Sequence, residues 1–294
     1  MRILVTGSKG QLGTELVRQA GAHEVIAADY GELDITDELA VSSFIRDIRP
    51  DVVINAAAYT AVDHAEADID AAYAVNRDGP ANLARACSES DVFLVHVSTD
   101  YVFDGSKCGA YSESDPIAPL GVYGQSKAAG EVAVRELCPR HLIFRTSWVF
   151  SAHGNNFVKT MLRLGAERDT LGVVSDQFGK PTSAAELARL ILAIIPDANG
   201  LWGTYHIAQP EVTNWHGFAA AIFDEARTQG WSLKLNQLSA IKTEDYPTPA
   251  RRPQNSELNC DKLEATFGMK IKPWFESLSE VIGEIKDGEN IDAN

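Results

Sequence analysis

The chain has few cysteines, few basic residues and a very short apolar run at its N-terminus, and each shortage excludes a class of protein. Its four cysteines lie far apart with no C-x-x-C spacing, which argues against a zinc site or a disulfide framework. The run Ile3-Leu4-Val5 reaches glycine too soon for a signal peptide or a membrane span. We therefore expect a cytoplasmic protein with reduced thiols.

The charge balance is acidic. There are 26 Lys and Arg against 41 Asp and Glu, for a formal net charge of -15. Such a surface repels phosphate backbones and anionic lipids, so we expect neither nucleic acid nor a membrane as a partner. An anionic small ligand would need a local basic pocket. At 294 residues and 45% hydrophobic, the chain is long enough for one large domain or two, and a globular enzyme fits this composition.

The first half alternates short apolar runs with amphipathic stretches. Strands are expected over residues 2–6, 24–29, 51–55, 92–98 and 141–146. β-Branched runs such as Val52-Val53-Ile54 suit strands buried on both faces, so the alternation predicts an α/β fold with a Rossmann-type, doubly wound parallel sheet.

After about residue 150 the pattern changes. Helices are expected over residues 155–168, 186–195 and 215–227, with loops rich in Pro, Arg and Asn between later segments. We therefore expect a dinucleotide-binding domain over residues 1–150. A smaller, mainly substrate-binding lobe would occupy residues 151–294, with some of its segments returning to the sheet.

A glycine motif follows the first predicted strand and opens a helix. It reads Gly7-Ser-Lys-Gly10-Gln-Leu-Gly13. Its glycines allow a tight turn and a close approach of the backbone to a diphosphate, whose charge the helix N-terminus attracts. The spacing is G-x-x-G-x-x-G rather than the G-x-G-x-x-G of many dehydrogenases.

Acidic residues follow the second predicted strand. Asp29 stands where a carboxylate accepts hydrogen bonds from an adenosine ribose, which favours NAD by repelling a 2′-phosphate. Lys9 could instead pair with that phosphate, so the choice between NAD and NADP stays open. Asp34 and Ile35 could border the adenine, and helix capping is an equal alternative for Asp34.

Two further strands end in residues suited to a ligand crevice. The small residues of Asn55-Ala-Ala-Ala58 leave room for a cofactor over the carboxyl edge of the sheet, although they also suit helix packing. Ser98-Thr99-Asp100 places hydroxyl groups at the same edge, where Thr99 could donate to a substrate carbonyl or merely cap the next turn.

Tyr123 and Lys127 are four residues apart, so a helix would place them on one face. A cation beside a phenol favours the phenolate and lowers the pKa of the tyrosine. Together with Thr99 they would form a carbonyl-reducing site, in which a nicotinamide gives hydride and Tyr123 gives the proton.

In this order, these motifs resemble the extended short-chain dehydrogenase/reductase superfamily. Longer segments are similar to the dTDP-4-dehydrorhamnose reductases within it. They cover residues 49–58, 97–105, 144–150, 154–157 and 247–253, and so fall in both expected lobes.

The resemblance implies reduction of the 4-keto group of dTDP-6-deoxy-L-lyxo-4-hexulose to dTDP-L-rhamnose with NADPH or NADH. Thr99 would polarise the ketone, Tyr123 would donate the proton, and Lys127 would hold the nicotinamide ribose. The remaining cofactor contacts that it implies are Gly10, Gln11, Leu12, Asp29, Asp34, Ile35, Ala58, Tyr59 and Thr60.

The sugar-nucleotide contacts implied by the resemblance are Thr99, Asp100 and Trp148. Core packing is the alternative for Trp148. Asn156 and Arg252 are candidates for the diphosphate because the fork of arginine suits phosphate, with Arg251 as the alternative to its neighbour.

Some members of this family dimerise around a magnesium ion held by glutamates. Glu15 and Glu284 match two of those positions. The third falls on Ala185, with Glu186 one residue later and so about 100° around a helix. We expect a homodimer, with magnesium as an option.

Two alternatives remain. Another nucleotide-sugar epimerase or dehydratase would share the fold and the Tyr/Lys pair, but dehydratases usually add an acid pair beside the threonine, where this chain has Asp100-Tyr101. A non-catalytic regulatory subunit like that of methionine adenosyltransferase would bind the cofactor without turnover. The presence of Thr99, Tyr123 and Lys127 argues against it.

Overall fold

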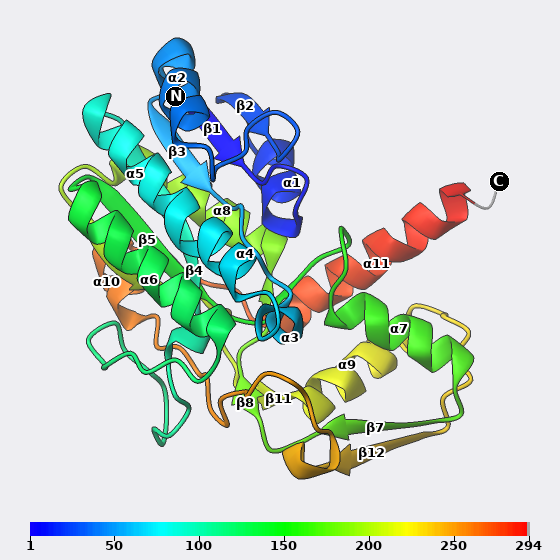
Figure 1. Cartoon of the computed structure of the whole chain (residues 1–294). Helices are drawn as coiled ribbons and strands as arrows, with labels where there is room; N and C mark the ends of the chain where they lie inside the picture. The colour runs from blue at the N-terminus through cyan, green and yellow to red at the C-terminus, as the bar shows by residue number, and fades with distance from the viewer. Residues whose placement is uncertain (293–294) are drawn as a thin grey trace.

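The computed structural model describes residues 1–292 and contains a six-stranded sheet in the order β10-β5-β4-β3-β1-β2, with all neighbours parallel (Figure 1). Its strands are β1 (Arg2–Thr6), β2 (Glu24–Ala28), β3 (Val52–Asn55), β4 (Phe93–Thr99), β5 (His141–Thr146) and β10 (Gly203–His206). The chain runs outward from β1 to β2 and then returns past β1 to β3. Ligands bind at such a reversal of strand order, at the carboxyl ends of the strands.

Helices cover both faces of the sheet because its strands are apolar on both sides. Ile3 and Val5 pack against one set of helices, whereas Leu4 packs against the other. The first set is α1 (Gln11–Arg18), α8 (Ala184–Ile194) and α10 (Asp261–Phe267), and the second is α2 (Glu38–Ile48), α5 (Gly79–Glu89) and α6 (Val122–Leu137). The short helices α3 (Val62–Ala65) and α4 (Ile69–Tyr73) precede α5, with a π-helical segment over Ala74–Asp78.

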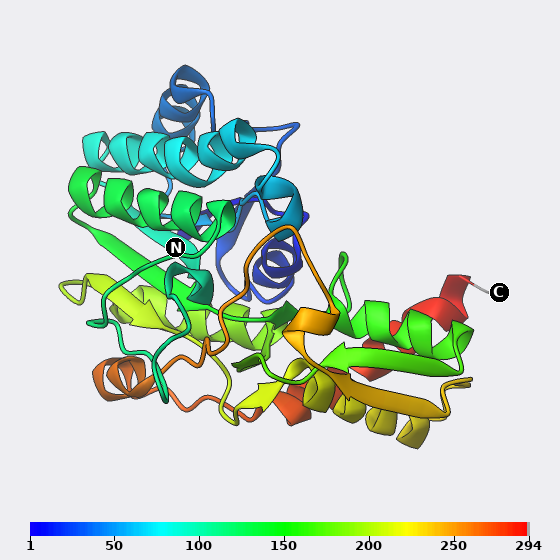
Figure 2. The ribbon, with the colours of Figure 1, turned by 60° about the horizontal axis from the view of Figure 1, so that its bottom comes forward.

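A second lobe has a core of its own, in which Phe150, Phe218 and Trp274 are buried. Figure 2 shows its helices against a two-stranded parallel sheet, to one side of the six-stranded sheet. Its larger elements are α7 (Phe157–Glu167), β7 (Thr170–Val174), α9 (Trp215–Thr228), β12 (Gln237–Ile241) and α11 (Trp274–Asp292). Two-residue strands pair as β6 (Val149–Phe150) with β9 (Thr182–Ser183), and β8 (Phe178–Gly179) with β11 (Thr213–Asn214).

The doubly wound parallel sheet is the fold that the sequence predicts. The five predicted strands agree with β1 to β5 to within one residue at either end. The chain after residue 150 serves both parts of the molecule, since α8, β10 and α10 lie with the six-stranded sheet and the larger remainder forms the second lobe. Among residues 1–292, no helix is long and apolar enough to cross a membrane.

Candidate active site

A cavity of about 770 Å³ lies at the carboxyl edge of the sheet, between the sheet and the second lobe. It brings together nearly all the residues that the sequence singles out for cofactor and substrate. The predicted residues in its wall are Gly7, Gly10, Gln11, Leu12, Asp29, Asp34, Ile35, Ala58, Tyr59, Thr60, Thr99, Asp100, Tyr123, Lys127, Trp148 and Asn156.

The glycine turn forms one end of this cavity. Gly7 has φ +67°, and a Cβ atom at Gly13 would lie 2.1 Å from the carbonyl oxygen of Gly7, so Gly13 supports the turn from behind. Gly10 caps helix α1 without any side-chain hydrogen bond. The first N–H groups of α1 are therefore free of a side-chain cap, as a diphosphate requires.

The adenosine end is acidic. The backbone N–H of Asp29 donates to Glu32 (3.0 Å), and the Lys9 ammonium lies 3.5 Å from the same carboxylate. Lys9 is thus already paired, although at an exposed site where such a pair is weak. Asp34 accepts from the N–H (2.9 Å) and hydroxyl (2.8 Å) of Thr36. The cap of α2 is Asp37, so helix capping does not account for Asp34.

Tyr123 and Lys127 lie one turn apart on α6. Lys127 is 2% exposed, and its Nζ donates to the carbonyl oxygen of Val97 (2.6 Å). Burial lowers the pKa of Lys127 to about 8, against the opposing charge of Glu131. Burial raises the pKa of Tyr123 to about 12, the Asp100 charge adds to the rise, and hydrogen bonding with Thr99 opposes it. The net lowering of the Tyr123 pKa that we expect from the Lys127 charge is therefore not seen in this structure, because desolvation raises the pKa by more than the neighbouring groups lower it.

Thr99 ends β4 in the cavity wall, and Asp100 follows it as the first residue of a short 3₁₀ turn. The Thr99 hydroxyl donates to Asp100 Oδ1 (3.0 Å) and accepts from the N–H of Tyr101 (3.2 Å), so Thr99 caps the following turn as well as lining the cavity. Asp100 Oδ2 is buried and has no hydrogen-bond partner among the described residues. Burial raises the pKa of Asp100 to about 7. A buried oxygen without a partner in a cavity wall can accept a hydrogen bond from a bound ligand.

Thr146 is a wall residue that the sequence reasoning missed. It ends β5 in direct register with Thr99, and its buried hydroxyl has no partner among the described residues. The strand-end argument that identified Thr99 applies equally to Thr146. Behind them, Glu131 accepts from Ser98 (2.6 Å) and from Arg145 (2.8 and 2.7 Å), which fixes β4 and β5 against α6.

Comparison with known proteins decides the family. The model of the RmlD substrate binding domain family matches residues 1–286. The dTDP-4-dehydrorhamnose reductase of Aggregatibacter actinomycetemcomitans is 46% identical over 95% of this chain and 98% of its own. The chain belongs to the dTDP-4-dehydrorhamnose reductase family.

Solved structures of this reductase family agree with the assignment. The one from Clostridium acetobutylicum is 42% identical, has a TM-score of 0.92, and covers 97% of this chain and 100% of its own. The one from Bacillus anthracis, in complex with NADP, is 38% identical with a TM-score of 0.91, and covers 96% and 99%. The predicted family, fold and class of NAD(P)H-dependent oxidoreductase are confirmed.

The residues predicted for the sugar nucleotide in this reductase divide into two groups. Trp148 and Asn156 lie in the cavity wall, and the Asn156 amide donates to Gln11 Oε1 (3.1 Å) while its oxygen caps α7. Arg252 lies outside that wall and pairs with Asp63 (2.7 Å), and Arg251 is exposed. The diphosphate role of Arg252 stays a prediction.

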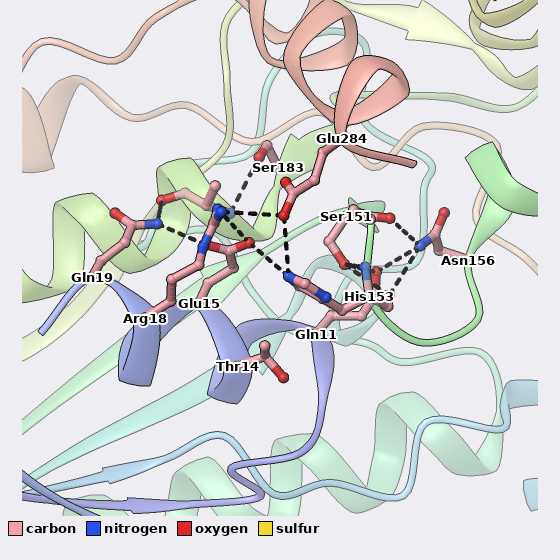
Figure 3. Close-up of polar contacts among 12 residues, drawn as sticks. Gln11, Thr14, Glu15, Arg18, Gln19, Ser151, His153, Asn156, Ser183 and Glu284 are labelled. Atoms are coloured by element: carbon pink, nitrogen blue, oxygen red, sulfur yellow. Dashed lines mark hydrogen bonds and ion pairs between the residues drawn. The ribbon is translucent and has the colours of Figure 1, made fainter. Parts of the chain in front are cut away.

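The magnesium expectation for the reductase can be tested at Glu15 and Glu284, which converge as Figure 3 shows. Arg18 donates to both carboxylates (2.8 and 3.1 Å), and His153 Nε2 lies 3.4 and 3.6 Å from them. Glu186 instead accepts from Arg189 and from the backbone of Lys272. Mg²⁺ prefers oxygen ligands, but the third group at this point is the imidazole of His153, and the Arg18 guanidinium already compensates the charge of Glu15. The described residues therefore do not fit a site of three carboxylates.

Proposed function

We propose that this chain reduces the C4 ketone of dTDP-4-dehydro-L-rhamnose to give dTDP-L-rhamnose, with NADPH or NADH as the reductant. One observation carries the proposal: Thr99, Tyr123 and Lys127 share a single cavity with the glycine turn. The names of the relatives at 46% and 42% identity support this substrate, and the complex of the relative from Bacillus anthracis supports NADP as one cofactor.

The bound nicotinamide would supply hydride to the carbonyl carbon, and the protein would supply the proton to the carbonyl oxygen. Tyr123 is suited to this step because its pKa of about 12 keeps it protonated at neutral pH. Lys127, whose pKa is about 8, is mostly charged at neutral pH and lies one helical turn from Tyr123. Its charge would hold the nicotinamide ribose and stabilise the phenolate that proton transfer leaves behind.

Thr99 would polarise the ketone, and Asp100 controls where its hydroxyl points. When Asp100 is ionised, the Thr99 hydroxyl donates to it, as the structure has it. When Asp100 is protonated, the carboxyl group can donate instead, which frees the Thr99 proton for the substrate oxygen. A pKa of about 7 places both states within the neutral range.

Trp148, Asn156 and Arg252 remain the proposed contacts for the sugar nucleotide. The two wall residues border the cavity from the second lobe, and Arg252 lies on the loop that ties that lobe to α3 through Asp63. Homodimerisation and a cytoplasmic location stay predictions of the sequence.

The proposed activity can be tested by mixing the purified chain with enzymatically prepared dTDP-4-dehydro-L-rhamnose and either NADPH or NADH. Oxidation of the cofactor is followed by absorbance, and the product is identified by NMR. Cofactor consumption that yields dTDP-L-rhamnose would support the proposal and rank the two cofactors. Binding of NADP without consumption would instead favour a regulatory subunit, and consumption with a different keto sugar would favour another nucleotide-sugar enzyme.

A further inference from the structure

Trp148 adopts a backbone conformation that bulky residues rarely take. It follows β5 by two residues and has φ +47°, in the left-handed region. The chain is fixed on both sides of it, because the Ser147 hydroxyl donates to the carbonyl oxygen of Lys180 (2.6 Å) and the Trp148 carbonyl accepts from the N–H of Thr182 (3.3 Å). Because of this bend, the side chain of Trp148 lines the cavity although the residue lies just beyond the end of β5.

A second tryptophan lies against it. The rings of Trp148 and Trp215 stack with centroids 3.6 Å apart and planes 8° from parallel. Trp215 is the first residue of α9, whose Asn214 cap accepts from the N–H of Gly217 (2.8 Å). Its ring also contacts Phe157, 4.7 Å between centroids, and through it the core of the second lobe.

The indole of Trp148 is confined on another side by Gly179. A Cβ atom at that glycine would lie 2.7 Å from Cε2 of the ring, so only glycine leaves room for the indole in its present position. Trp148 lines the cavity, whereas Trp215 is not among the described residues of its wall. The stack therefore connects the cavity wall to a residue outside it.

We propose that Trp215 is a positioning residue for the sugar nucleotide. Stacking holds the strained Trp148 so that its indole stays in the cavity wall as a flat face for the thymine base, and the affinity for the nucleotide then depends on a residue that does not touch it. Without Trp215, relaxation of the left-handed backbone would withdraw the indole from the wall. The identity of the ligand rests on the proposed function.

The test uses the full chain and dTDP as the probe, with Trp215→Ala, Trp215→Phe and the control Trp231→Ala. Trp231 packs against the same lobe core and has no ring contact with Trp148 among the described residues. Calorimetry gives the Kd for dTDP and for NADPH. Steady-state kinetics separates KM from kcat, and near-ultraviolet circular dichroism reports the coupled indoles.

Trp215→Ala should lose the coupled indole signal and raise both the Kd for dTDP and the KM for the keto sugar by about tenfold, about 1.4 kcal/mol. The NADPH affinity and kcat should stay near those of the unaltered chain. Trp215→Phe should restore most of the dTDP affinity, and Trp231→Ala should leave it unchanged.

Three results would overturn the inference. These are loss of the indole signal with unchanged dTDP affinity, an equal loss of affinity in Trp231→Ala, and no recovery in Trp215→Phe. If Trp215→Ala does not fold, Trp215→Leu replaces it in the same comparison with Trp215→Phe. No binding of dTDP by the unaltered chain would count against the proposed function itself, and the inference would fall with it.

Discussion

Lys127 on α6 donates a 2.6 Å hydrogen bond from its Nζ to the carbonyl oxygen of Val97 on β4. Val97 is two residues before Thr99, so this bond fixes the helix that carries Tyr123 against the strand that carries Thr99. The ammonium group is buried to make it. The arrangement of the three catalytic candidates therefore comes at a cost in stability.

That cost predicts that Lys127→Met is more stable than the unaltered chain at neutral pH. The pKa of Lys127 is about 8 in the folded protein, against its usual value of 10.5, which we take for the unfolded chain. The buried charge therefore destabilises the fold below about pH 8 and no longer does so above about pH 10.5. The gain in unfolding free energy at neutral pH should reach up to about 3 kcal/mol and vanish in strong alkali. Urea unfolding at neutral pH and in alkali measures this gain in unfolding free energy. Turnover of the variant should be lost. A variant less stable at neutral pH would contradict this account.

Tyr123→Phe tests the proton donor. Removing only the hydroxyl leaves the ring in place, so NADPH affinity should change little while kcat falls by about 10² to 10⁴, the usual effect of lost acid catalysis. Stopped-flow reduction and a parallel binding titration separate the two effects. Equal turnover in both proteins would remove Tyr123 from the mechanism.

Asp100→Asn should flatten the pH dependence of stability. The pKa of Asp100 is raised from 3.8 to about 7, so its contribution is fully present below the lower value and is lost as pH rises through about 7. The unaltered chain should lose up to about 4 kcal/mol of unfolding free energy over this range, and the variant should lose much less. Denaturation at about pH 5 and about pH 8 tests this, and parallel slopes in the two proteins would refute it.

Gly13→Ala should damage the glycine turn. The added Cβ would lie 2.1 Å from the Gly7 carbonyl oxygen and 2.6 Å from the Cα of Ser8, both backbone atoms that cannot move cheaply. We expect a loss of about 1–3 kcal/mol or more in stability, with weaker NADPH binding. Gly31→Ala is the matched control, since nothing lies within 4 Å of its added Cβ. Equal thermal stability and affinity in the two variants would show that the contact has no such role.

Metal removal should have no effect. Arg18 already compensates Glu15 and Glu284, and the described residues offer no third carboxylate at that point. Turnover and mass in solution should therefore be the same before and after treatment with EDTA. A loss of activity that magnesium restores would show that the cluster opens to take the ion.

The sheet and most of the cavity could be predicted because they follow local rules. Runs such as Val52-Val53-Ile54 identify buried strands, and strand ends in a parallel sheet meet at one edge. That rule predicts that Thr99 and Asp29 share one edge of the sheet, and both lie in the cavity wall there. Helical spacing placed Tyr123 beside Lys127 on α6.

The parts that could not be predicted depend on contacts between distant segments. The direction of the pKa shift of Tyr123 follows from how completely other elements bury it, which spacing does not reveal. Arg252 meets Asp63 across most of the chain length, and the left-handed bend at Trp148 has no sequence signal such as glycine. The two-residue strands of the second lobe are too short for any periodicity.

The most direct test of the central claim is transfer of deuterium from NADPH labelled at C4 of the nicotinamide. The account predicts one deuterium at C4 of the rhamnosyl group of the product, seen by NMR as loss of that proton signal, and about a hundredfold less labelled product when Tyr123→Phe is assayed for the same time. Deuterium at another carbon, or product formed without deuterium from either face of the labelled cofactor, would contradict reduction of the C4 ketone at this site.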